Sequence, residues 1–208
     1  MDGVFMKKTV KFVGILLLVA VFAWCGTVIA DRQRLNRELI RMHVVANSDS
    51  PQDQQVKLLV KDGVNLWLQE NMPRSIQTDE ALSWLRENAA QLESVAREVL
   101  EEAGAEQTVR VEVKKGAFPK RSYDTFSLPA GVYESLRITL GEGEGENWWC
   151  VVFPSLCLPA AGRSFGDTAA GAGFPDSLTG ALEGHTGYEV RFFVLDCLGY
   201  LENLFFKG

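Results

Sequence analysis

The stretch LIRMHVVANSDSP, residues 39–51, changes its pattern halfway along. Residues 39–46 are mainly β-branched and long apolar residues, which is typical of a strand. Residues 47–50 end that strand, and Ser50 followed by Pro51 is the usual pairing of a helix N-cap with the first helical position. The sequence therefore predicts a strand that passes directly into a helix.

Patterns on the C-terminal side of this stretch predict two helices and three more strands. Apolar residues at spacings of three and four predict a first helix over 51–71, with Lys57 and Lys61 off the apolar stripe and in solvent. A second helix is expected over 78–104, with Thr78 as its cap. Residues 141–146 are interpreted as the turn of a hairpin between the last two strands. The expected strands are 109–113, 132–140 and 148–153.

This order of elements predicts an α+β fold, a two-layer sandwich of helices on a mainly antiparallel sheet. Residues 160–187 hold seven glycines and few large side chains, so we expect an irregular insertion there. Residues 188–206 are apolar again. Either a strand running into a helix or a single helix fits them.

The N-terminal region determines the expected compartment. Lys7, Lys8 and Lys11 precede an uncharged apolar run of 19 residues, 12–30, which is the pattern of an export signal and is also long enough to cross a bilayer. Val28-Ile29-Ala30 resembles a cleavage site, so a cleaved signal and an uncleaved anchor both remain open. We divide the chain into a signal peptide or membrane anchor at 1–30 and an extracytoplasmic α+β domain at 31–208.

Composition narrows the class of partner. The chain carries 21 basic and 27 acidic residues, a net charge of −6. An acidic balance argues against nucleic acid or anionic lipid as the main partner.

The four cysteines differ in their surroundings. Cys25 lies in the apolar run, and the other three lie in the exported part, where disulfides persist. Cys150 and Cys157 are the pair we expect to be bridged, because Pro154 between them favours a turn. We then expect Cys197 to be a buried, reduced thiol. No close-spaced cysteine or histidine accompanies these residues, so we expect no zinc site and no cofactor.

His43 suggests two catalytic hypotheses. With Ser48 and Asp49 it has the residue types of a nucleophilic triad, and with Cys150 those of a thiol nucleophile and its base. Neither is favoured, because Ser48 lacks the glycines of a nucleophile elbow and Cys150 has an expected disulfide partner. Asn47, Ser48 and Asp49 are explained by capping and turn hydrogen bonds. We therefore expect no enzyme.

Trp148 and Trp149 are adjacent, so on a strand they face opposite sides of the sheet. One indole can enter the core. The other is then either covered by another element or left exposed, and an exposed tryptophan is a favoured anchor for a protein partner.

Two long motifs of the chain follow a known pattern. The first is IRMHVVANSDSPQDQ, residues 40–54. The second comprises Phe118-Pro119, Tyr123, Pro129-Ala130-Gly131-x-Tyr133, Leu136-Arg137-Ile138 and GEGEGENWWCVVFPSLC, residues 141–157. Both resemble the stage II sporulation protein R family, and the similarity covers about residues 38–158. The stretch 160–187 shows the least family pattern.

The resemblance implies a function that composition does not. Proteins of this family are forespore signals of endospore-forming bacteria, exported into the space between forespore and mother cell. There they activate a membrane-embedded aspartic protease that processes pro-sigma-E. The resemblance thus implies a signalling ligand, and an exported serine or thiol hydrolase using His43 with Ser48 or Cys150 is the alternative. The candidate partner-binding residues are His43, Asn47, Ser48, Asp49, Trp148 and Trp149.

Overall fold

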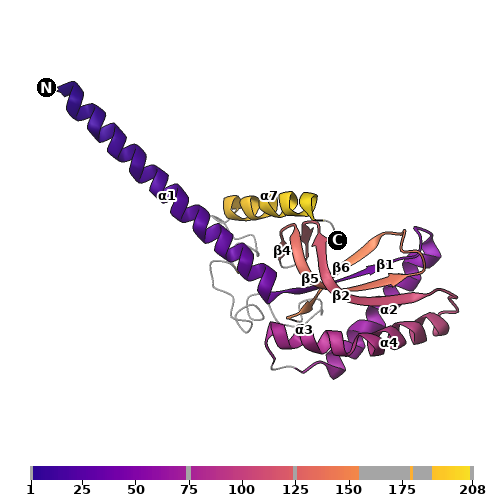
Figure 1. The fold of residues 1–208 in the computed structure, drawn as a ribbon. Coiled ribbons are helices and arrows are strands. Elements are labelled where there is room, and N and C mark those ends of the chain that lie inside the picture. Colours follow the sequence, from indigo (N-terminus) through magenta and orange to yellow (C-terminus); the bar gives the residue numbers. More distant parts are fainter. Residues whose placement is uncertain (1, 74–75, 124–125, 155–178, 180–188, 207–208) are drawn as a thin grey trace.

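The computed structural model describes residues 2–73, 76–123, 126–154, 179 and 189–206. The expected glycine-rich insertion at 160–187 lies, apart from residue 179, outside the described residues. The α+β class is confirmed (Figure 1). The elements are α1 (Asp2–Glu38), β1 (Ile40–Val45), α2 (Pro51–Asn71), α3 (Thr78–Glu87), α4 (Ala89–Glu102), β2 (Val109–Phe118), β3 (Arg121–Ser122), β4 (Ser127–Leu128), β5 (Gly131–Leu140), β6 (Asn147–Phe153) and α7 (Glu189–Phe205).

The main sheet has the strand order β2-β5-β1-β6. β1 pairs with β5 in parallel and with β6 antiparallel, and β2 pairs with β5 antiparallel. The predicted hairpin between β5 and β6 is therefore wrong, because β1 lies between them. Residues 141–146 instead cross the end of β1, where the Gly145 N–H donates to the Ala46 carbonyl at 2.9 Å.

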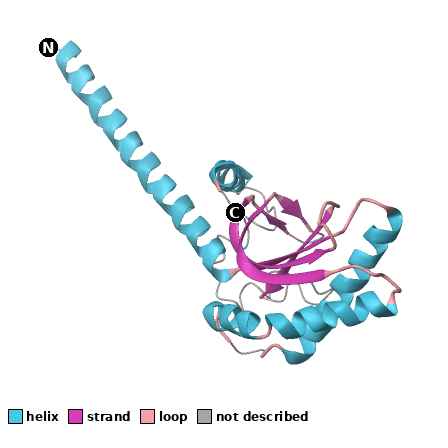
Figure 2. Ribbon diagram, turned by 45° about the vertical axis from the view of Figure 1, so that its right-hand side comes forward, coloured by secondary structure: helices cyan, strands magenta, loops and turns pink. Residues whose placement is uncertain are grey.

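Helices α2, α3 and α4 pack on one face of this sheet (Figures 1 and 2). The predicted start of α2 is confirmed, since the Ser50 hydroxyl accepts the Asp53 N–H at 3.1 Å. Gly63 gives α4 a close approach to α2, because a Cβ there would lie 2.6 Å from Val99 Cγ2. The core on this face is a cluster of aliphatic side chains from all three helices and from β1, β5 and β6.

The second predicted helix is two helices, α3 and α4, separated at Asn88. The Asn88 side chain donates to the Trp84 carbonyl at 2.9 Å, a local bond that competes with continued helix. The cap is also one residue earlier than predicted. Gln77 is the N-cap, and its N–H donates to Glu80 Oε2 at 2.8 Å.

The other face of the sheet carries a second cluster, built from the C-terminal part of α1, the β3–β4 hairpin and α7 (Figures 1 and 2). With both faces covered, every residue of β1 is buried, as expected of a central strand with a parallel neighbour. Residues 189–205 form a single helix, one of the two predicted alternatives. The buried members of the cluster are Val28, Leu35, Leu39, Phe118, Phe126, Leu128, Tyr133, Val151 and Leu195.

The apolar N-terminal run forms part of α1, which continues past Asp31 and Arg32 to Glu38 without a break. α1 is long and apolar enough to cross a membrane, and its apolar side chains between Val10 and Trp24 are largely exposed. Val28 and Leu35, further along, are buried in the domain. The potential membrane segment and the first core residues of the domain therefore share one helix.

Candidate functional site

The two sequence motifs meet at one end of the sheet. Residues 46–50, the first two turns of α2 and the connection 141–146 form a single hydrogen-bonded unit, here called the junction. Asn47 bridges its two halves, because its Nδ2 donates to Asp53 Oδ2 at 3.0 Å and its Oδ1 accepts the Glu142 N–H at 3.0 Å. Asp49 does the same, since its Oδ1 accepts the Glu146 N–H at 2.7 Å.

Asp53 is the acceptor at the centre of the junction. Its carboxylate accepts from the Ser48 hydroxyl at 2.5 Å and from Gln107 Nε2 at 2.5 Å, besides Asn47. The Ser48 hydrogen bond, followed by that of Asn47, holds the pKa of Asp53 below its ordinary value. A carboxylate with this set of donors organises the chain segments around it. Asp53 was not among the predicted site residues.

Lys57 was predicted to be in solvent, and this is wrong, since its side chain is buried. Its Nζ donates to the Glu146 carbonyl at 2.9 Å and to Gln54 Oε1 at 2.5 Å. Burial lowers the pKa of Lys57, and the Glu146 and Asp49 carboxylates partly offset this. The Lys57 ammonium thus joins α2 to the second motif. The prediction missed this contact because Lys57 lies off the apolar stripe of its helix.

The glycines of the connection are required by close packing. A Cβ on Gly141, which has φ +54°, would overlap the Asn47 side chain, and a Cβ on Gly145 would overlap the Ser48 carbonyl. The alternation of Gly and Glu therefore places glycine against the first motif and exposes the Glu142, Glu144 and Glu146 side chains.

His43 lies on the opposite face of β1 from the α2 core. Its ring stacks on Trp149 at a centroid distance of 5.1 Å and a tilt of 9°, and Phe118 lies 5.2 Å away. Burial, followed by the positive charge of Arg137, lowers the pKa of His43 to about 4. The imidazole is therefore neutral at neutral pH and is part of an aromatic core.

Arg41 is two residues earlier on the same face and was not predicted as special. It is fully buried, with its guanidinium 4.4 Å from the centre of the Phe118 ring and 5.0 Å from that of Tyr133. Nη2 donates to the Tyr123 hydroxyl at 3.1 Å. Among the described residues, Nε and Nη1 have no hydrogen-bond acceptor. The two aromatic faces thus compensate part of the cost of burying this cation.

The two tryptophans face opposite sides, as predicted. Trp149 packs into the aromatic cluster, and Trp148 remains 39% exposed on edge strand β6. Lys61 Nζ lies 4.7 Å above the Trp148 ring, which joins the indole to α2. Of the six predicted partner-binding residues, Asp49 and Trp148 are the exposed ones.

The structure assembles neither predicted catalytic pair. The Ser48 hydroxyl donates to Asp53, while His43 stacks on Trp149. Cys150 pairs in register with Met42 and faces the α2 core, on the opposite side of the sheet from His43. Cys150 is disulfide-bonded, and Cys25 and Cys197 are free thiols. Cys157, the predicted partner, lies outside the described residues. Cys197 is exposed and not buried.

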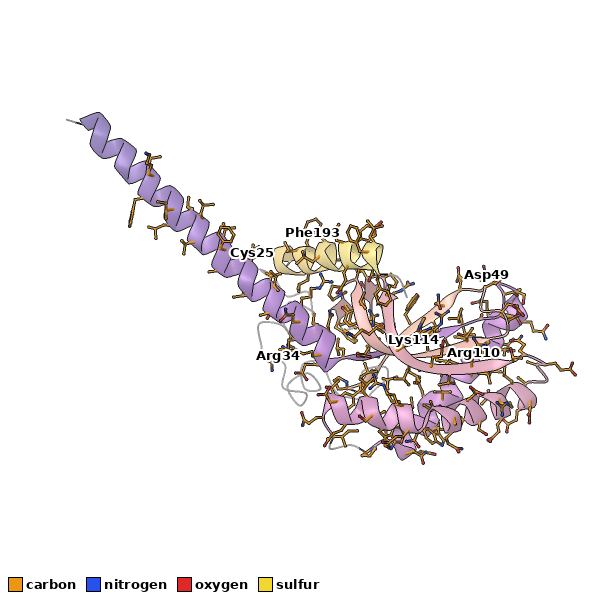
Figure 3. The ribbon with its side chains drawn as sticks, viewed as in Figure 1. Cys25, Arg34, Asp49, Arg110, Lys114 and Phe193 are labelled. Atoms are coloured by element: carbon orange, nitrogen blue, oxygen red, sulfur yellow. The ribbon has the colours of Figure 1, made fainter. Side chains whose placement is uncertain are left out.

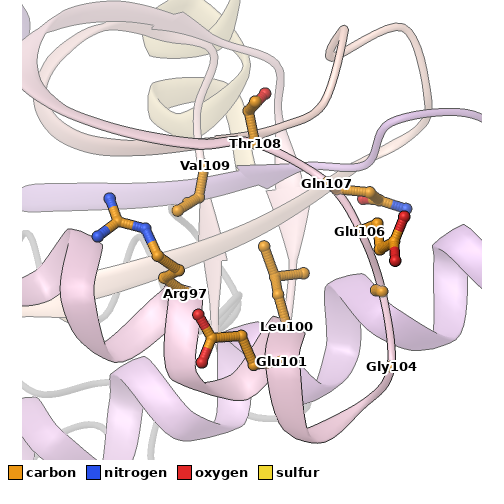
Figure 4. A pocket seen from close by; sticks show the side chains of 9 residues that line it. Arg97, Leu100, Glu101, Gly104, Glu106, Gln107, Thr108 and Val109 are labelled. Carbon is orange, nitrogen blue, oxygen red and sulfur yellow. The ribbon is translucent and has the colours of Figure 1, made fainter.

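Two open hollows lie away from these residues. One, of about 680 Å³, lies where the end of α1 meets α3 and β5. The other, of about 610 Å³, lies between the end of α4 and the start of β2 and is lined by Arg97 and Glu101 among others (Figure 4). Arg97 forms its ion pair with Glu93. Neither contains a predicted site residue. Within the described ranges, no cluster of three or more His, Cys, Asp or Glu forms a metal site.

Comparison with known proteins gives a family match. The family described as stage II sporulation protein R (spore_II_R) matches residues 36–162. Stage II sporulation protein R of Bacillus subtilis (strain 168) is 41% identical over 121 residues, which are 58% of this chain and 54% of that protein. The chain thus spans about half the length of this curated relative. No solved structure matches.

Proposed function

The chain belongs to the stage II sporulation protein R family, and on that basis we propose that it is an exported signal that activates the membrane-embedded aspartic protease processing pro-sigma-E in the mother cell. The family is one of sporulation signalling proteins. The partner, the export across the forespore membrane and the absence of catalysis are parts of the proposal.

The proposal rests on helix α1, which has an exposed apolar part followed by a part that is buried in the domain. The exposure of the apolar side chains from Val10 to Trp24 to water is unfavourable, because each of them is more stable in an apolar environment. The same helix then enters the core through Val28 and Leu35. The three lysines before the apolar run favour a cytoplasmic N-terminus and a domain on the far side. This supports a domain held at a membrane surface by an uncleaved helix.

The candidate contact surface is the junction end of the domain. Asp49 lies at the end of the domain remote from the N-terminus of α1 (Figure 3). Trp148 is the exposed aromatic residue nearest in sequence to the junction, and Lys61 holds it in place. His43, Asn47, Ser48 and Trp149 support this surface from beneath by the contacts given above.

The test is reconstitution of pro-sigma-E processing in a bacterium that does not form spores. The full chain is co-expressed with the membrane protease and pro-sigma-E, and the processed form is measured by immunoblot. Processing is expected with the chain and absent without it. Processing that is independent of the chain would refute the proposal.

Trp148→Ala tests the contact surface in the same assay. Loss of a central aromatic anchor costs about 2 kcal/mol or more, or roughly a 30-fold loss of affinity, so processing should fall at limiting expression. Arg110→Ala on β2, the opposite edge strand, is the matched control and should process normally. If both variants process like the wild type while remaining folded, Trp148 is not the anchor.

A further inference from the structure

Three polar side chains of helix α7 form hydrogen bonds with backbone groups at the sheet. Asp196 Oδ1 accepts the Ala130 N–H at 2.9 Å, and Glu202 Oε2 accepts the Val132 N–H at 3.2 Å. Asn203 Nδ2 donates to the Phe118 carbonyl at 2.7 Å. These side chains satisfy backbone groups of Ala130, Val132 and Phe118, at or beside the sheet. The inner face also contains Leu195 and Gly199, which are buried.

The outer face of α7 is apolar. A surface helix of a soluble domain normally has the reverse arrangement, with its apolar stripe toward the core. The exposed residues recur at spacings of three and four, so they share one face, and Cys197 lies on it. Such a patch marks contact with an apolar surface. Its large members, with their exposed fractions, are Phe193 (65%), Tyr200 (67%), Leu201 (51%), Leu204 (67%) and Phe205 (79%).

The position of α7 identifies that surface. α7 packs against α1, and Arg32 forms an ion pair with Glu202. Arg32 is the second residue after the apolar run of α1 ends, which places this contact at the expected membrane boundary. Figures 1 and 3 show α7 beside the lower half of α1, with Phe193 near Cys25 of α1. The exposed apolar residues of α7 therefore lie close to the end of the apolar run of α1.

We propose that α7 lies in the interface of the same membrane that α1 crosses, with its outer apolar face among the lipid headgroups and first acyl carbons. Interfacial helices bury their apolar face roughly 5–10 Å into this boundary. Tyr200 suits that depth, because its ring is apolar and its hydroxyl is polar. The inference rests on the proposed anchoring by α1.

Lipid is a better occupant than an anionic surface or a protein. The described side chains of α7 include no basic residue, its partly exposed Glu202 is paired with Arg32, and the chain is acidic overall, so the binding is apolar and does not need anionic lipid. Since α1 already holds the domain at the membrane, insertion of α7 is an intramolecular event at high effective concentration. A short apolar helix that would bind weakly alone is then held in the interface.

The experiment uses the full chain in phosphatidylcholine vesicles. Cys25→Ser leaves Cys197 as the free thiol on the outer face of α7, to which an NBD fluorophore is attached. Quenching is measured with nitroxide-labelled lipids and with aqueous iodide. Two control positions are labelled in a background lacking both free thiols, Val13→Cys in α1 and Arg110→Cys on the far part of the sheet (Figure 3).

The label at Cys197 should be quenched several-fold more by nitroxide lipid than the label at position 110, and should be protected from iodide as at position 13. Adding Leu201→Ser and Leu204→Ser should reduce this lipid quenching while leaving thermal unfolding unchanged. Iodide access at Cys197 equal to that at position 110 would overturn the inference while leaving the anchor intact. Protection from both quenchers would overturn it in favour of a protein cover, such as a second copy. Iodide access at position 13 would overturn the anchor as well.

Discussion

Replacing His43 by phenylalanine should remove a defined part of the pH dependence of stability. The pKa of His43 is about 4 in the folded protein, against 6.5 for an ordinary histidine, because the ring is buried beside Trp149 and near the charges of Arg137, Arg41 and Lys114. The unfolded chain therefore binds a proton that the folded chain does not. Protonation of the unfolded chain therefore lowers the free energy of unfolding as the pH falls from 6.5 to about 4, whereas above pH 6.5 His43 has no such effect. At 1.36 kcal/mol per pKa unit, the loss is about 3 kcal/mol.

The assay is chemical unfolding of the full chain in detergent micelles, followed by tryptophan fluorescence at several pH values across this window. Phenylalanine keeps an aromatic ring against Trp149 but does not titrate, so His43→Phe should flatten the dependence between pH 6.5 and 4. His185, the other histidine of the chain, is present in both proteins, so the difference between the two slopes isolates His43. Asp53 acts below this window, because its pKa is lowered from 3.8. Equal slopes in the two proteins would refute the assignment of a buried neutral imidazole.

Three further substitutions test the packing. Gly145→Ala should destabilise by about 1–3 kcal/mol through overlap with the Ser48 carbonyl, lowering Tm by about 2–4 °C per kcal/mol; the exposed Glu144→Ala is its control, and equal Tm values would contradict close packing of the junction. Gly199→Ala should detach α7, because a Cβ there would overlap the Ala130 carbonyl; hydrogen exchange of α7 amides should rise, whereas in Gly26→Ala, which meets open space, it should not. Arg41→Met should change the unfolding free energy by no more than about 1 kcal/mol. The substitution removes a buried cation with two unsatisfied donor nitrogens and keeps apolar packing on Phe118. A loss of about 3 kcal/mol or more would show that the cation itself is needed.

Local signals in the sequence were sufficient for the helix start at Ser50, for the strand regions and for the opposite orientations of the two tryptophans. The pairing of strands was not accessible in this way. Gly141 to Glu146 has the composition of a hairpin turn, but its N–H groups bond to residues 46 and 47, far away in sequence. A turn pattern records which backbone conformations are allowed and does not record which strand lies alongside.

The candidate site shows the same limit. Asp53, Lys57 and Arg41 are charged. Lys57 was predicted to lie in solvent, and no structural role was predicted for Asp53 or Arg41. All three are buried because partners from distant segments compensate them, namely Gln107, the Glu146 carbonyl and the ring of Phe118. Periodicity assigns a residue to a face of its own element. It does not reveal a hydrogen-bond acceptor that another segment brings to that face.

The junction gives the two sequence motifs a structural explanation, and this changes where a signalling contact should be sought. The junction is held together by contacts among Asn47, Ser48 and the glycines of the connection. The same residues in a relative would therefore indicate the same fold, and they are weaker evidence for a shared binding surface. Asp49 and Trp148 keep exposed side chains on this frame. Asp49 lies at the end of the domain remote from the N-terminus of α1 (Figure 3). If α1 crosses one membrane and α7 lies in its interface, as proposed, that end points away from this membrane. It would then face the mother-cell membrane that is proposed to hold the protease, and this geometry favours contact between two opposed membranes over contact within one.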